Sequence, residues 1–174
     1  DVRWQQGARY AFEQAKRAGV TTLLDGDVTP QDITCPVALS DHAVFSSLGL
    51  ARFSATQDAD AGLAMAARIT DGQVYMTQGS EGIKWREGDH LCHISAFKTD
   101  VVDTTGAGDV FHGALALALA EGQPTPDAIR FASAVAALKC TQPGGRDGIP
   151  DRAQTAAFLS RYESFCPLRR SEGQ

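Results

Sequence analysis

Blocks of apolar residues with helical spacing and with strand-like spacing alternate along the chain. Small and apolar side chains recur every three or four positions over residues 8–15, and Gly19 ends this pattern. The β-branched run at 20–24 follows at once and predicts a strand, which ends at the polar turn Asp25-Gly26-Asp27. The chain therefore opens with a predicted helix and a predicted strand.

The alternation continues through the middle of the sequence. A loop that carries Pro30 and Pro36 leads to a short apolar run at 43–45, which predicts a second buried strand. Residues 60–69 have helical periodicity, and residues 74–77 form another strand-like run. Helices that alternate with buried strands are typical of α/β proteins.

Further strand signals precede the second half of the chain. Residues 82–86 and 91–94 flank the polar turn 87–90, which predicts a β-hairpin. Val101-Val102 predicts a short strand that runs directly into a glycine-rich turn at 103–109. The sequence thus predicts strand, turn and helix in direct succession at this point.

Three helices are predicted after the turn. Nearly every residue from 110 to 120 is apolar or small, so this helix is expected to be buried over most of its circumference. Thr125-Pro126-Asp127 supplies a cap, an N1 proline and an acidic first turn for a helix at 127–139, and a third helix covers 152–162. The pattern predicts an α/β sandwich with a mostly parallel sheet, and 174 residues suit a single domain, 1–174.

Composition and charge exclude several classes of protein. The net charge of −5 offers no basic surface for nucleic acid, and no apolar stretch approaches the ~18 residues of a membrane span. The sequence begins at Asp1 without Met and without a signal-peptide pattern, so it is expected to start inside a gene product. The cysteines lack metal-site spacing, and we expect free thiols in a reducing cytosol at Cys35, Cys92, Cys140 and Cys166.

The segment 103–109, DTTGAGD, carries the clearest chemistry. A glycine-rich turn that opens a helix directs several backbone N–H groups to one spot, which attracts phosphate. Asp109 beside that spot is well placed to take a proton from an attacking hydroxyl. Alternatively, Asp109 merely complements the helix dipole and the glycines merely turn the chain. The residues by themselves indicate an anion site with an acid beside it.

The longer run 103–116, DTTGAGDVFHGALA, resembles the C-terminal signature of the PfkB (ribokinase-like) carbohydrate kinases. Segments that agree with this family in order and spacing are LDGD at 24–27, TQGSEG at 77–82 and AALKCTQPGGRDGIP at 136–150. The resemblance implies a three-layer α/β/α sandwich and ATP-dependent phosphorylation of a sugar at a primary hydroxyl. Within the family, the sequence is most similar to the branch that acts on 6-deoxy-6-sulfofructose and makes its 1-phosphate.

The resemblance also assigns roles to individual residues. It implies that Asp109 is the catalytic base and that the amides of Gly106, Ala107 and Gly108 stabilise charge on the transferring phosphoryl group. Residues beside the nucleotide are implied to be Thr77, Gly79, Gly82, Ala137, Cys140 and Gly144, the last three within the adenine-side segment 136–145. Asp103 and the Thr105 carbonyl match positions that hold a monovalent cation, K⁺, in many members.

The sequence departs from the family pattern at two cation positions. Many relatives have Asn-x-x-Glu near Mg²⁺-ATP, whereas residues 46–49 here read Ser-Ser-Leu-Gly. Magnesium is therefore expected to be held through Asp27 and water. Gly148 occupies a cation-site position that is Ser in some relatives.

The resemblance leaves part of the family's machinery outside this chain. The sugar-binding aspartate, a glycine pair and a lid that serves as a dimer surface belong to an N-terminal part absent from residues 1–174. We therefore expect these residues to be inactive alone, and a homodimer is conceivable for the complete protein. The alternatives are a kinase of another sugar and a non-catalytic nucleotide-binding fragment.

Arg3 is the candidate residue for binding the substrate. Residues 1–4 resemble the end of a central strand, where ligands gather in α/β sheets. The Arg3 guanidinium would then bind the sulfonate of the sugar through two parallel hydrogen bonds. The alternative is that Arg3 pairs with a nearby carboxylate or is simply solvated.

Overall fold

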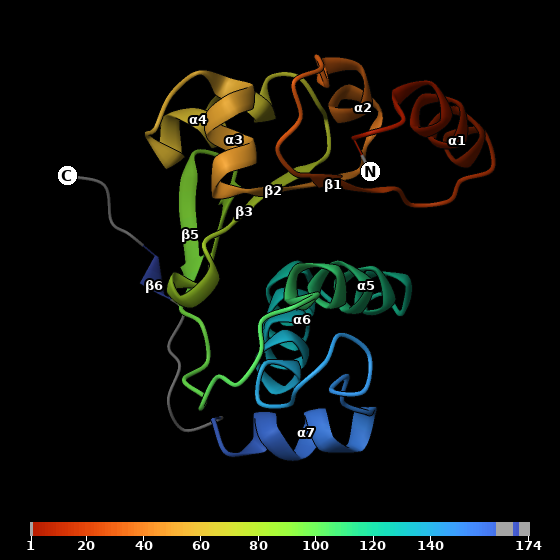
Figure 1. Cartoon of the computed structure of the whole chain (residues 1–174). Helices are drawn as coiled ribbons and strands as arrows, with labels where there is room; N and C mark the ends of the chain where they lie inside the picture. The colour runs from red at the N-terminus through yellow and green to blue at the C-terminus, as the bar shows by residue number, and fades with distance from the viewer. Residues whose placement is uncertain (1, 163–168, 171–174) are drawn as a thin grey trace. The chain divides into compact units, whose positions relative to one another are not determined.

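The computed structural model describes residues 2–162 and 169–170 (Figure 1). The chain divides into two compact units, which are described separately: residues 1–93 with 169–174, and residues 94–168. Within the described residues, no helix is both long and apolar enough to cross a membrane. The prediction of a single domain stays a prediction.

The sheet is mixed, and its strands follow one another in chain order. They are β1 (Leu23–Gly26), β2 (His42–Ser46), β3 (Gln73–Thr77), β4 (Ile83–Glu87), β5 (His90–Ile94) and the two-residue β6 (Arg169–Arg170). Strands β1, β2 and β3 are parallel, whereas β4 runs antiparallel to β3 and β6 antiparallel to β5.

The prediction of a mostly parallel sheet is therefore wrong. Only five residues, 78–82, connect β3 to β4, and part of them forms the 3₁₀ turn η1 (Gly79–Glu81). Two residues, Gly88 and Asp89, connect β4 to β5. A parallel pair needs a crossover of a dozen residues or more, so these short links can produce only antiparallel neighbours. The predicted hairpin is confirmed.

Apolar residues from strands and helices form the core of the first unit. The helices are α1 (Gln5–Arg17), α2 (Thr34–Leu39), α3 (Ser47–Ser54) and α4 (Ala59–Ala67). Helices α3 and α4 pack on the strands, and Figure 1 shows both on the same face of β2 and β3. The cluster contains Val2, Leu24, Ile33, Val37, Ala43, Phe45, Leu50, Leu63, Ala66, Val74 and Met76.

The pattern located most elements of this unit and missed two helices. The predicted strand at 20–24 begins only at Leu23 and includes Asp25 and Gly26, because Thr22 is engaged by the Asp41 carboxylate through its amide and its hydroxyl, both at 2.8 Å. The loop carrying Pro30 and Pro36 contains α2. Helix α3 begins at a serine cap, where the Ser46 hydroxyl accepts the Gly49 amide at 2.9 Å. Residues 2–4 are a turn rather than the end of a strand.

The second unit contains three helices: α5 (Ala107–Ala120), α6 (Thr125–Lys139) and α7 (Arg152–Ser160). Helix α6 packs against both α5 and α7. The rings of Phe158 and Tyr162 both pack edge-on against Phe97, and the Tyr162 hydroxyl donates to the Lys98 carbonyl at 2.9 Å. This contact attaches the segment around Phe97, which precedes α5, to the end of α7.

Several predictions for this unit need correction. Val101 and Val102 are 60% and 64% exposed and form no strand, since the Val102 amide donates to Cys140 rather than to a strand partner. Helix α5 buries one stripe, which includes Phe111 and Leu115, while Leu117 is exposed, so it is not buried over most of its circumference. Thr125 is the first residue of α6 rather than its cap.

Candidate active site

The turn before α5 is built around a glycine that no other residue type replaces without strain. Gly106 has φ 73° and forms the N-cap of the helix. The Ala107 amide donates to the Thr104 carbonyl at 3.0 Å, and the Val110 amide donates to Gly106 at 2.9 Å. Among the described residues, no group accepts a hydrogen bond from the amides of Gly108 and Asp109. The helix therefore offers donors and the positive end of its dipole to an anion.

Asp103 fastens this turn to the segment that follows α6. One carboxylate oxygen accepts the Thr105 amide and the other accepts the Gly144 amide, each at 2.8 Å. The Cys140 carbonyl accepts the amides of Val102 and Asp103 at 2.8 and 3.1 Å. The structure thus brings together two segments, 103–109 and 140–144, that are far apart in sequence.

These hydrogen bonds lower the pKa of Asp103 to about 2; the amide and hydroxyl of Thr105 contribute most, followed by the Gly144 amide and the Lys139 charge. A carboxyl group whose pKa is lower in the folded state stabilises the fold above its unfolded pKa of ~3.9. That contribution is lost as the pH falls through about 2. Asp103→Asn should therefore lower the melting temperature at neutral pH, and its difference from wild type should shrink as the pH falls from ~4 towards 2. Melting curves across this range would contradict the assignment if the difference were constant.

A cavity of about 710 Å³ lies within the second unit beside this turn. Thr105, Gly106 and Asp109 line one part of it, and the rest is lined by side chains of α5 and α6, by the loop after α6 and by the start of α7. Cavities of this size with a few polar groups are typical of small-molecule sites. Gly145 and Arg146 also line the cavity, whereas the predicted nucleotide residues Ala137, Cys140 and Gly144 are not among its lining residues.

Cys140 is a buried cysteine in the segment that follows α6. Cys140 is 9% exposed, and burial raises the pKa of its thiol. Cys35 and Cys140 are free thiols, as predicted, and Cys166 lies outside the described residues. A buried thiol with a raised pKa is a poor nucleophile, so Cys140 contributes packing rather than chemistry.

In the first unit, the predicted residues lie along the carboxyl ends of the parallel strands. Asp27 follows β1, Ser46 ends β2 and Thr77 ends β3 opposite Ser46. The Ser46 hydroxyl donates to Asp27 at 3.2 Å, and the Thr77 hydroxyl donates to the Phe45 carbonyl at 3.3 Å. Gly79 and Gly82, with φ of 55° and 102°, shape the turn that follows.

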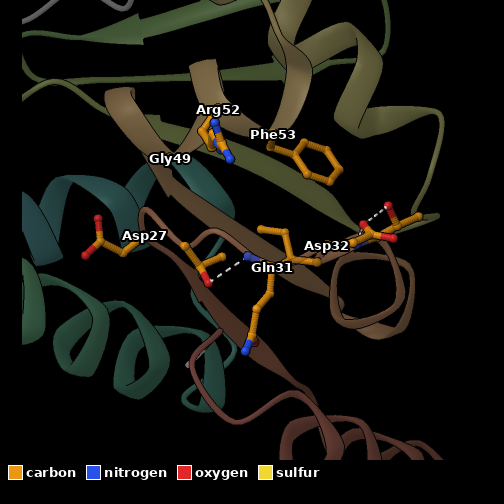
Figure 2. A pocket seen from close by; sticks show the side chains of 9 residues that line it. Asp27, Gln31, Asp32, Gly49, Arg52 and Phe53 are labelled. Atoms are coloured by element: carbon orange, nitrogen blue, oxygen red, sulfur yellow. Dashed lines mark hydrogen bonds between the residues drawn. The ribbon is translucent and has the colours of Figure 1, made fainter.

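A small pocket of about 120 Å³ opens next to Asp27 (Figure 2). Asp27 and Asp32 lie at opposite ends of the view, with Arg52 and Phe53 of α3 between them. Arg3 pairs with Asp27 at 3.3 Å, which is the carboxylate pairing considered as the alternative role of Arg3. No cluster of three or more His, Cys, Asp or Glu side chains suited to a metal occurs within the described residues.

The structure explains why the Asn-x-x-Glu pattern is absent at 46–49. A Cβ atom on Gly49 would collide with the backbone carbonyl of Gly26 at the end of β1. Helix α3 therefore packs on β1 only with glycine at this position. The acidic side chain of the relatives has no room here.

Sequence reasoning missed Lys139, which is fully buried and donates to the Asp103 carbonyl at 2.9 Å. A signal for it was present. Ala128, Ala132, Val135 and Lys139 recur at spacings of four, three and four and form one buried face of α6.

A family model described as pfkB family carbohydrate kinase matches residues 3–152. The ribokinase of Bacillus subtilis (strain 168) is 37% identical over 95 residues, which cover 55% of this chain and 32% of that protein. The structure of a proposed ribokinase from Agrobacterium tumefaciens aligns with a TM-score of 0.86 at 34% identity, over 94% of this chain and 55% of that chain. Ribokinase of Arabidopsis thaliana, solved with ribose and ATP, gives 0.79 at 28% identity, over 90% and 53%. The chain thus spans about half or less of these relatives.

Proposed function

The chain belongs to the pfkB family of carbohydrate kinases, and from that premise we propose that the whole protein transfers the γ-phosphoryl group of ATP to a primary hydroxyl of a sugar. The observation that carries the proposal is the turn before α5. There, amides with no partner among the described residues lie at a helix N-terminus, and Asp109 lines the adjoining cavity.

In this reaction Asp109 accepts the proton of the sugar hydroxyl as that oxygen forms a bond to the γ-phosphorus. The bond from the γ-phosphorus to the bridging oxygen breaks, and ADP leaves with that electron pair. The amides of Gly106, Gly108 and Asp109 lie at the N-terminus of α5, where they would stabilise the charge that develops on the phosphoryl oxygens. The Ala107 amide donates to Thr104 and is the least suited of the predicted donors.

Thr77, Gly79 and Gly82 are proposed to lie beside the nucleotide phosphates, and Ala137, Cys140 and Gly144 beside adenine and ribose. The glycine turn after β3 and the contact of 140–144 with Asp103 support these roles. The three-layer sandwich, the lid, the cytoplasmic location and a homodimer stay predictions for the whole protein.

Asp27 is the proposed protein ligand of Mg²⁺. When bound, the ion would neutralise charge on the phosphate oxygens. A half-exposed carboxylate fits this use, because Mg²⁺ commonly takes one or two carboxylates and completes its shell with phosphate oxygens and water. The predicted K⁺ site at Asp103 and the Thr105 carbonyl lies beside the buried Lys139 ammonium, which donates to the Asp103 carbonyl.

The test of the activity is ADP formation by the whole protein with Mg²⁺-ATP and a panel of sugars. The panel contains ribose, fructose, fructose 6-phosphate and 6-deoxy-6-sulfofructose, which is the proposed substrate. Sugar-dependent ADP formation supports the proposal. ATP binding by calorimetry without turnover of any sugar would favour the non-catalytic alternative, and equal kcat/KM for all sugars would contradict the substrate.

Arg3→Ala should raise KM for 6-deoxy-6-sulfofructose ~10-fold or more and leave KM for ATP nearly fixed, because it removes a charge-assisted hydrogen bond. Arg9→Ala is a matched control, since both arginine side chains are 63% exposed and each pairs with a carboxylate. An unchanged KM for the sulfonate would contradict this role and leave Arg3 as the ion-pair partner of Asp27.

A further inference from the structure

Lys139 is a buried positive charge that contacts the first residue of the proposed phosphate-binding turn. It is the last residue of α6, and its exposed fraction is 0%. Its ammonium donates to the Asp103 carbonyl at 2.9 Å. Burying an ammonium destabilises a fold unless opposite charge and hydrogen bonds offset the loss of hydration. The position therefore needs a compensating partner.

Two features of the surroundings supply that compensation. The C-terminal end of α6 carries the negative end of the helix dipole, which favours a cation in the last turn. The Asp103 carboxylate, which interacts electrostatically with Lys139, adds a full negative charge. Lys139 thus holds the backbone of Asp103. Asp103 begins the turn that leads to Gly106 and to the amides of Gly108 and Asp109.

The donor set that the resemblance implies for K⁺ fits these residues poorly. The Asp103 carboxylate accepts the amides of Thr105 and Gly144, and the buried Lys139 ammonium already acts on it as a positive charge, which leaves less negative charge for a second cation. At Gly148, where some relatives have Ser, a Cβ atom would lie 2.9 Å from the Gln142 Cβ and 3.0 Å from the Lys139 carbonyl. The loop therefore has no room for a serine ligand without moving.

We propose that the Lys139 ammonium takes the part of the monovalent cation, so that this protein phosphorylates its sugar without K⁺. Lys139 is then a positioning residue. It holds the Asp103 backbone and contributes a fixed positive charge at the start of the phosphate-binding turn. The inference rests on the proposed function.

The first experiment needs no variant. Rates of ADP formation by the whole wild-type protein are compared in KCl and in tetramethylammonium chloride at equal ionic strength. We expect less than about a two-fold difference, because a fixed neighbouring charge repels an added cation. Stimulation by K⁺ of ~10-fold or more, as expected where a bound ion supplies the charge, would overturn the inference.

The second experiment removes the charge and keeps the length of the side chain. Lys139→Met should lower kcat ~10-fold or more with little change in KM for ATP, and K⁺ or NH₄⁺ should restore part of the loss. Lys139→Arg should retain more activity than Lys139→Met. Lys98→Met is the control, since Lys98 is exposed in the same unit. Equal activity of Lys139→Met and wild type in tetramethylammonium chloride would overturn the inference.

A third readout is independent of activity. The melting temperature of the wild-type protein should be the same in KCl and in tetramethylammonium chloride, since K⁺ has no site to bind. A rise in KCl of several degrees would overturn the inference even if a variant fails to fold. Absence of turnover in every salt would instead contradict the proposed function and leave this measurement to decide the role of Lys139.

Discussion

Asp109→Asn is expected to lower kcat of the whole protein by at least ~100-fold and to leave its affinity for ATP nearly unchanged, because a general base contributes about 10²–10⁴-fold to a proton transfer. Asp109 lies in the first turn of α5, and it lines the cavity beside Gly106. Asparagine keeps the shape of the side chain but cannot accept the proton. Steady-state kinetics together with calorimetric titration of ATP would measure both quantities.

A matched substitution separates this role from a purely structural one. Asp127 also lies in the first turn of a helix, α6, and complements the dipole of that helix. If Asp109 served only its helix dipole, Asp109→Asn and Asp127→Asn would have similar small effects. A rate above a tenth of wild type in Asp109→Asn would contradict its assignment as the base.

Gly108→Val is expected to abolish phosphoryl transfer and to preserve most of the fold. The structure refines the reason. Gly108 does not have a positive φ, and a Cβ atom there would meet nothing within 4 Å. Valine is therefore tolerated by the backbone, and the loss follows from its two methyl groups blocking the approach of phosphate to the amides. Circular dichroism beside the kinase assay would measure both effects.

Gly106→Val provides the contrast, because its φ of 73° is unfavourable for a β-branched residue. That variant should lose stability as well as activity. Gly108→Ala, with a single methyl group, should lose less activity than Gly108→Val. Full activity in a folded Gly108→Val protein would mean that the turn is structural only.

Periodicity located elements where tertiary packing and local pattern agree. The strands at β2 and β3 and the hairpin of β4 and β5 are confirmed because their apolar spacing matches what they bury. The helix at α1 is also confirmed, although it has no buried residue and only the partly buried Phe12 packs against the core. Helix α2 was not predicted, because Pro36 is typical of a loop; proline is nevertheless tolerated in a first helical turn. The valines at 101 and 102 have strand propensity, but no neighbouring strand pairs with them.

The turn at 103–109 was expected from motif and resemblance, whereas its hydrogen bonds to the segment 140–144 were not. The buried charge of Lys139 was not expected, because lysine is almost always a surface residue. Its burial is visible only when Asp103 is placed against the end of α6. The sequence also could not show that Arg3 and Asp27 are partners, since 24 positions separate them. Such pairings depend on the fold as a whole.

The close packing of α3 on β1 restricts how this protein can change. Returning residue 49 to the glutamate of its relatives, by mutation or in a chimaera, would first displace the helix from the Gly26 carbonyl. A single substitution there would therefore damage the fold before it could improve metal binding. A gain in magnesium affinity would therefore have to come from other positions along the same edge of the sheet where a longer side chain meets no backbone.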